Sequence, residues 1–217
     1  MGRRMIQLLA DGRFALFLLI LFALMLSLTL HEFGHALAAK LYGDDTAQRA
    51  GRLTLNPIPH IHPAGLLMVV LLGFGFAKPV PTDPRNYKSR SGVLVVSAAG
   101  PAMNLILAVA TVNLYLLGRK WGFEPLAEPG PQFFFFYLAQ INLLLMVFNL
   151  IPLGALDGHY ILPYFLPGPL ALRYRYYNAR YGNYVLLGLV VLSIMGLPIF
   201  EYVFAVSQSL LPLIVFI

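Results

Sequence analysis

One long apolar run, residues 14–42, restricts the fold of this chain more than any other feature. It is long enough to cross the hydrocarbon core of a bilayer as a single helix. Residues 93–117 and 133–153 form two further runs of this kind. Charged residues make up only 11% of the chain, whereas soluble domains carry roughly 25%. The sequence therefore predicts an all-α polytopic membrane protein.

The segments outside these runs complete the predicted fold. Residues 184–217 are expected to add C-terminal transmembrane helices. Residues 64–76 are apolar but short for a span, which favours a re-entrant or tilted segment. Alternating polar and apolar residues at 52–55 predict a short β strand or hairpin near the membrane surface. No linker divides the chain, so residues 1–217 are expected to form a single integral membrane domain.

Composition removes some classes of function from consideration. The chain has no cysteine, which excludes disulfides, thiolate zinc ligands and cysteine nucleophiles. Its formal net charge is +6, but most basic residues lie between the apolar runs, where the positive-inside rule accounts for them. The expected surroundings of this chain are therefore a lipid bilayer and not nucleic acid.

The motif HEFGH, residues 31–35, places three ionisable side chains inside the first apolar run. On a helix His31 and His35 lie one turn apart on one face, so their neutral imidazoles can bind one zinc ion. Glu32, beside the first histidine, can act as general base and later as general acid. The alternative is a polar patch where the helix leaves the membrane. A carboxylate in an apolar span is costly without compensation, which favours the metal site.

A catalytic zinc ion usually has three protein ligands and an open position. The pattern HExxHxxGxxH is absent, so the third ligand must come from another segment. Asp157 is favoured because it follows a full span in NLIPLGALDG, residues 149–158, where Pro152 and Gly154 break the helix. The alternative for Asp157 is an ordinary turn at the membrane exit. The other histidines that could complete the site are His60, His62 and His159.

Together these motifs resemble the site-2 protease family of intramembrane zinc metalloproteases. HEFGH in a transmembrane helix is paired with N-x-x-P-x-x-x-x-D-G after a later span. The stretches GRLTLNPIPHIHPAG, GFAKPVPTDPRNYKSRSG and SAAGPAMNL are similar to those of compact members that lack PDZ and CBS domains. The resemblance extends from about residue 14 to residue 166. It implies a catalytic core of three helices, which here would be residues 14–42, 93–117 and 133–153.

The resemblance implies a function and a role for each motif residue. It implies one Zn²⁺ per chain, held by His31, His35 and Asp157, with Glu32 as the catalytic base. It also implies that Asn149 lies near the scissile carbonyl, where its amide could stabilise the oxyanion or position the substrate. An interhelical hydrogen bond is the alternative for Asn149. The expected activity is hydrolysis of peptide bonds in transmembrane substrate proteins, in the plasma membrane of a prokaryote.

Three details concern the surroundings of the expected site. Residues 53–55 are expected to pair, as a strand, with an unwound substrate segment. His60 and His62 are two residues apart, so in a strand they would share a face and form a second possible metal pair. Ordinary surface positions are the preferred interpretation for both. Gly34 is expected to let a neighbouring backbone approach the first helix closely.

Two other classes of function are alternatives. A non-catalytic membrane scaffold would keep the fold and hold substrates, but Glu32 and the three expected ligands are all intact. A metal transporter would also place histidines and carboxylates in the membrane. Against it, the chain shows one compact cluster without a second series of ionisable residues across its spans.

Overall fold

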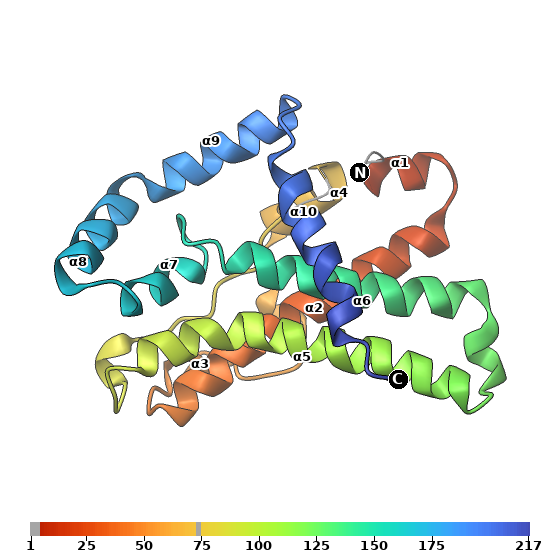
Figure 1. The fold of residues 1–217 in the computed structure, drawn as a ribbon, viewed down its shortest axis with the longest axis horizontal. Helices are drawn as coiled ribbons and strands as arrows, with labels where there is room; N and C mark the ends of the chain where they lie inside the picture. The colour runs from red at the N-terminus through yellow and green to blue at the C-terminus, as the bar shows by residue number, and fades with distance from the viewer. Residues whose placement is uncertain (1–4, 73–74) are drawn as a thin grey trace.

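The computed structural model describes residues 5–72 and 75–217. Three long helices form its core: α2 (Phe14–Leu41), α5 (Gly92–Lys120) and α6 (Pro129–Asn149). They pack side by side, and α6 runs back along α5 after a tight connection (Figure 1). In the described part of the chain, these are the unbroken helices long and apolar enough to cross a membrane. The predicted three-helix core is confirmed, and its last helix ends a few residues earlier than expected.

Shorter helices surround this core. They are α1 (Met5–Ala10), α3 (Thr46–Arg49), α4 (Pro63–Leu72), α7 (Gly158–Ile161), α8 (Gly168–Tyr177), α9 (Asn183–Ile194) and α10 (Ile199–Leu210). A π-helical turn, Asn178–Gly182, joins α8 to α9. The joined helices α8–α9 meet α10 at a bend of 92°, which makes this pair a broken span or a re-entrant segment. The predicted apolar segment 64–76 corresponds to α4 as far as residue 72, and residues 73–74 lie outside the described chain.

Fully buried apolar side chains, two of them alanines, fill the contact between α5 and α6. Ala108 and Val112 of α5 meet Ala139 and Leu143 of α6, and all four are fully buried. Ile214, in the 3-10 turn after α10, closes this cluster. Since lipid gives apolar helices no hydrophobic reason to associate, close contact between small residues is one of the main forces holding such a pair together.

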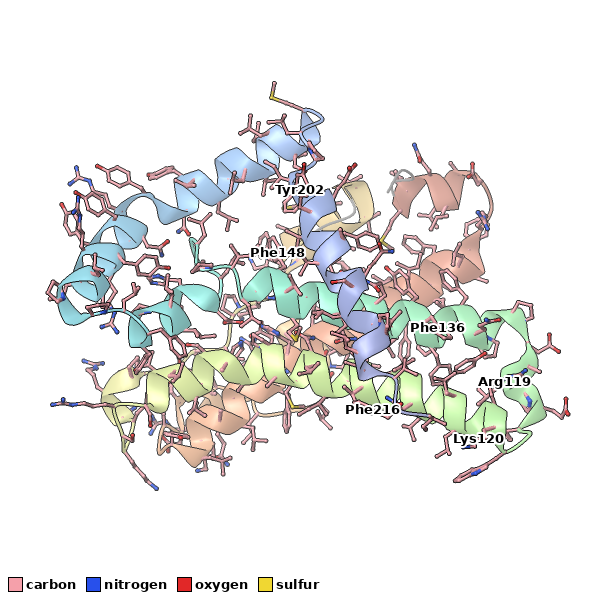
Figure 2. All side chains as sticks on the ribbon, in the orientation of Figure 1. Arg119, Lys120, Phe136, Phe148, Tyr202 and Phe216 are labelled. Atoms are coloured by element: carbon pink, nitrogen blue, oxygen red, sulfur yellow. The ribbon has the colours of Figure 1, made fainter. Side chains whose placement is uncertain are left out.

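Helix α10 crosses the outside of α6 (Figure 2). The ring of Phe148 on α6 lies 5.9 Å from that of Phe200 on α10, measured between centroids. Gln140 of α6 donates a hydrogen bond of 2.8 Å to Ser207 Oγ of α10, and Ser207 is fully buried. One aromatic and one polar contact therefore attach the C-terminal helix to the core.

The predicted strand at residues 52–55 is wrong, because residues 5–72 and 75–217 contain no β strand. The backbone N–H of Asn56 donates to Thr54 Oγ1 at 3.1 Å, and that of Ile58 donates to Asn56 Oδ1 at 3.0 Å. Such side-chain acceptors compete with a strand ladder and favour turns. Pro57 and Pro59 remove two further donors. Pairing of residues 53–55 with a substrate strand therefore loses its structural basis.

Arg52 turns inward, and only 4% of it is exposed. Its guanidinium donates to the carbonyls of Lys78 and Pro79 and to His60 Nδ1. Because a guanidinium can only donate, His60 Nδ1 accepts, and Nε2–H donates to Thr54 O at 3.0 Å. The surface position predicted for His60 is thus wrong: it is 1% exposed and orients the arginine.

Asp44 fastens the loop before α5 to the end of α2. Its carboxylate is fully buried and accepts hydrogen bonds from Thr46, from Asp83 N–H at 2.7 Å and from Asn86 Nδ2 at 3.0 Å. Burial acts to raise the pKa of this carboxyl, but these hydrogen bonds outweigh it and lower the pKa to about 2. The ionised form is therefore part of the fold.

Replacing Asp44 should remove a pH-dependent part of the stability. A carboxyl whose pKa is lowered on folding stabilises the protein above its unfolded pKa of about 4, and this contribution is lost as the pH falls towards about 2. We expect Asp44→Asn to lose about 2 kcal/mol of unfolding free energy at pH 7, and the gap should narrow on acidification. Thermal unfolding in detergent at several pH values measures this. Asp45→Asn, at the neighbouring half-exposed carboxylate that pairs with Arg49, is the control; equal effects at both positions would contradict the prediction.

Candidate metal centre

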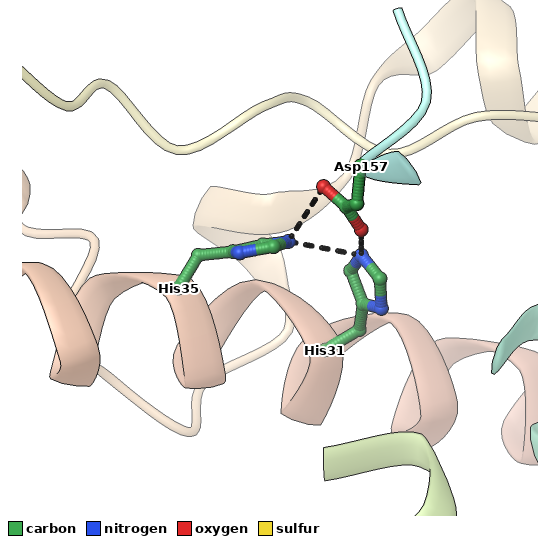
Figure 3. Close-up of side chains that lie close together, drawn as sticks. All are labelled: His31, His35 and Asp157. Atoms are coloured by element: carbon green, nitrogen blue, oxygen red, sulfur yellow. Dashed lines mark hydrogen bonds and ion pairs between the residues drawn. The ribbon is translucent and has the colours of Figure 1, made fainter. Parts of the chain in front are cut away.

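The side chains of His31, His35 and Asp157 converge on one point (Figure 3). The two Nε2 atoms lie 3.1 Å apart. His31 Nε2 is 3.3 Å from Asp157 Oδ2, and His35 Nε2 is 3.3 Å from Asp157 Oδ1. His31 is buried, and the other two side chains are mostly buried. The structure thus brings together the three residues predicted from HEFGH and NLIPLGALDG.

These separations fit a tetrahedral metal site. Ligands that lie 2.0–2.1 Å from a tetrahedral zinc ion are about 3.3 Å from one another. Two imidazole nitrogens and a carboxylate oxygen are also a donor set that zinc accepts. Among the described residues, this is the group of three histidine or carboxylate side chains close enough to share a metal ion.

The protonation of the imidazoles makes a cation necessary at this point. His35 Nδ1 lies 2.7 Å from Val96 O, and a carbonyl can only accept, so Nδ1 carries the hydrogen. The lone pair of the neutral ring is then on Nε2 and points at His31 and Asp157. His35 Nε2 is 3.1 Å from His31 Nε2 and 3.3 Å from Asp157 Oδ1. Lone pairs that face each other at these distances repel unless a proton or a metal ion lies between them. A metal ion satisfies all three ligands at once.

A chain of hydrogen bonds from all three core helices orients His31 in the same way. Asn142 Nδ2 donates to Leu138 O, so Asn142 Oδ1 accepts from Asn104 Nδ2 at 2.8 Å. Asn104 Oδ1 therefore faces His31 Nδ1, at 2.7 Å, and must accept from it. Asn142 also donates to Ser27 Oγ at 2.8 Å, on the α2 turn before His31. Asn104 and Asn142 are fully buried, so this arrangement fixes the tautomer and direction of the imidazole.

Glycine at position 100 leaves room for both rings. A Cβ atom there would lie 2.3 Å from His35 Nε2 and 2.7 Å from His31 Cε1. Gly158 has a similar role beside the third ligand, because a Cβ would lie 2.2 Å from Leu150 O. The loop that carries Asp157 can pack against the end of α6 only with glycine at this position.

Glu32 is buried on α2, directly after His31. Its Oε2 accepts a 3.0 Å hydrogen bond from the backbone N–H of Val80. Val80 belongs to an extended segment whose preceding carbonyls, at Lys78 and Pro79, are held by Arg52. The predicted base is therefore oriented by a loop and not by another helix.

The structure places the remaining candidate residues outside the cluster. Asn149 is the last residue of α6 and donates to Leu145 O, at 2.9 Å, within its own helix. The ring of His62 packs against that of Phe76, with 4.9 Å between the ring centroids. His159, on α7, lies 3.4 Å from the hydroxyl of Tyr174. Neither His62 nor His159 joins the three converging ligands.

Sequence reasoning missed several supporting residues. Neither Asn104 nor Asn142 was predicted as part of the site, although an amide within an apolar span is itself a signal of a buried polar network. Val80 contributes only its backbone N–H to Glu32, and no residue pattern marks such a contact.

Comparison with known proteins agrees with the geometry. The sequence profile described as "Peptidase family M50" matches residues 19–195. No solved structure was found to match the chain.

Two relatives illustrate the similarity. "Putative zinc metalloprotease YwhC" from Bacillus subtilis is 45% identical over 147 residues, which cover 66% of this chain and 67% of the relative. A protein of the same description from Mycolicibacterium smegmatis, Rip2, is 36% identical over 151 residues, covering 66% of this chain and 55% of Rip2. The chain thus spans about two thirds of one relative and little more than half of the other.

Removing the partner of His31 should weaken metal binding. Asn104→Leu leaves His31 Nδ1–H buried without an acceptor, and we expect zinc affinity to fall about 10–100-fold. Asn104→Asp keeps an acceptor for this hydrogen and should retain most of the affinity. Competition with a chelator of known affinity, in detergent, measures both. The assignment is refuted if the two variants lose affinity equally.

Proposed function

The chain belongs to peptidase family M50, and we propose that it is a zinc metalloendopeptidase of the site-2 protease type that cleaves transmembrane segments of substrate proteins. One observation carries the proposal: His31, His35 and Asp157 converge within the apolar core, and Glu32 lies next to the first of them. Buried ionisable groups in a membrane are costly, and a metal site compensates for that cost. The names of the relatives and the spacing of the ligands support zinc.

Each residue of the site has a distinct task. His31, His35 and Asp157 would hold the metal ion through two imidazole nitrogens and a carboxylate oxygen. A zinc ion there would supply a Lewis acid and a water that loses its proton near neutral pH. Glu32 would act as general base towards the attacking water and then as general acid towards the leaving amine. The Val80 N–H donates to one oxygen of the Glu32 carboxylate, and this contact orients the second oxygen.

The location of the site supports a substrate that is itself embedded in the bilayer. His31 and His35 lie within α2, a helix that could span the membrane. A substrate helix hides its backbone carbonyls in its own hydrogen bonds, so it must unwind before hydrolysis. We place the protein in the plasma membrane of a prokaryote, as its bacterial relatives indicate.

The first test separates metal binding from catalysis. We expect about one zinc per wild-type chain, markedly less zinc in Asp157→Ala, and full zinc in Glu32→Gln. Glu32→Gln should lose at least about 100-fold in cleavage, because the general base is missing. Zinc is measured by mass spectrometry of protein purified without chelators. Cleavage is measured on single-span reporter proteins that carry a helix-breaking Asn-Pro or Gly-Pro pair at mid-span.

Glu124→Gln, at an exposed carboxylate on the connection before α6, is the matched control and should change neither quantity. Zinc-loaded wild type that cleaves no reporter, or that cleaves as well with Gln at position 32, would contradict the enzyme and favour a scaffold. Zinc flux into liposomes would instead favour a transporter.

Asn149 is proposed to donate its free amide hydrogen to the oxyanion of the substrate, since only one hydrogen is used within α6. Removing one such donor typically costs about 100-fold in kcat. We therefore expect Asn149→Ala to cleave about 100-fold more slowly with unchanged zinc content. Gln140→Ala on the same helix, which breaks only the contact with Ser207, is the control. If Asn149→Ala cleaves at the wild-type rate, the proposed role in stabilising the oxyanion is wrong and Asn149 only forms the end of α6.

A further inference from the structure

The third ligand is held differently from the two histidines. His31 and His35 have fixed acceptors for their second nitrogen, in Asn104 and Val96. Asp157 Oδ2 is buried, and in the described chain it receives no hydrogen bond; its ion-pair neighbour is His31 Nε2. The position of this carboxylate therefore depends on the backbone that carries it.

That backbone is irregular. Residues 150–157 connect α6 to α7 without helix or strand. Gly154, near the middle, has a φ of +61°, which is the left-handed region that glycine favours. Such a loop lacks the regular backbone hydrogen bonds of a helix or a sheet, so its conformation depends on neighbouring segments.

Asn178 supplies the missing support. Its Oδ1 accepts from the N–H of Gly154 at 2.9 Å, and its Nδ2 donates to the carbonyl of the same residue at 3.0 Å. Asn178 and Gly154 are both buried. One amide side chain thus satisfies both backbone groups of the glycine, as a neighbouring strand would. Since buried backbone groups need partners, this contact restricts the loop strongly.

The π-helical turn gives Asn178 this position. Gly182, at the end of the turn, lies so close that a Cβ would be 3.0 Å from the N–H nitrogen of Gly154 and 2.3 Å from Asn178 Oδ1. One turn before Asn178, the hydroxyl of Tyr174 donates to Pro152 O at 2.8 Å. Three hydrogen bonds from a single helical segment therefore reach two residues of the loop.

We propose that Asn178 is a positioning residue for Asp157, and that it couples the helix α8–α9 to the metal centre. Backbone hydrogen bonds between residues three apart, such as Leu156 N–H to Leu153 O at 3.2 Å and His159 N–H to Leu156 O at 3.1 Å, restrict the path from Gly154 to Asp157. A displacement of Gly154 is thus transmitted to the carboxylate. This inference rests on the proposed function only in taking Asp157 as a zinc ligand.

The structure offers a matched control for the test. Asn113, on α5, also clamps a backbone: it donates to Ile214 O at 2.7 Å and accepts from Phe216 N–H at 2.8 Å. Its loop is the C-terminal end of the chain and carries no ligand. Asn178→Ala and Asn113→Ala therefore remove the same chemistry from two places, and only one of these places leads to Asp157.

Zinc affinity, measured by chelator competition in detergent on the full chain, is the main readout. We expect Asn178→Ala to weaken zinc binding about tenfold, at the lower end of the range for supporting residues, and Asn113→Ala to change it less than about twofold. The visible absorption of the cobalt-substituted protein should shift in Asn178→Ala alone, because it reports the geometry of the ligands. Thermal unfolding of both variants measures the purely structural cost.

Each outcome decides between the two roles. Equal losses of zinc affinity in the two variants, or an unchanged cobalt spectrum in Asn178→Ala, would overturn the inference and make Asn178 a residue of the fold only. Should Asn178→Ala fail to fold, Tyr174→Phe removes the bond to Pro152 together with the 3.4 Å contact to His159 Nδ1, and an unaltered cobalt spectrum there would also overturn the inference. Wild-type protein without zinc would overturn the proposed function, and this inference with it; zinc-bound wild type with unaffected variants would overturn this inference alone.

Discussion

The hydrogen-bond chain from Ser27 through Asn142 and Asn104 to His31 is the interaction on which the rest of the structure depends. Each of the three core helices supplies at least one member: α2, α6 and α5. Between apolar helices in lipid, such contacts and close packing replace the hydrophobic effect. Removing one member leaves its neighbours unsatisfied where the dielectric constant is low. The same hydrogen bonds therefore fix both the arrangement of the three helices and the direction of the His31 imidazole.

The glycines of the core impose the same coupling by steric means. A Cβ at Gly34 would lie 2.7 Å from Ala99 O, and one at Gly100 would lie 2.3 Å from His35 Nε2. The close approach of α5 to α2 that these glycines permit also brings Val96 O within hydrogen-bonding distance of His35. The expectation that Gly34 admits a neighbouring backbone is confirmed, and the distances explain why the contact lies beside the metal ligands.

Local pattern predicted the spans well but not the segments between them. Length and apolar character are sufficient to identify α2, α5 and α6, because a helix in lipid satisfies its own backbone. The alternation at residues 52–55 was misleading because Thr54 and Asn56 satisfy nearby N–H groups, and Arg52 turns inward towards two carbonyls. A residue pattern does not reveal which buried acceptors a distant loop will offer.

The convergence of Asp157 on His31 and His35 was expected from its place in a broken stretch after a full span and from the family resemblance, since spacing along the chain alone does not show that two distant segments meet. The residues that support the metal ligands also differ in whether the sequence reveals them. Asn104 is an amide inside an apolar span and so is visible in the sequence, whereas Asn178 lies in a polar stretch where asparagine is unremarkable. The histidines are held by the three-helix core, Asp157 by a loop and Glu32 by Val80 N–H. Because Asp157 and Glu32 depend on separate loops, metal binding and the orientation of the base can respond to different parts of the protein.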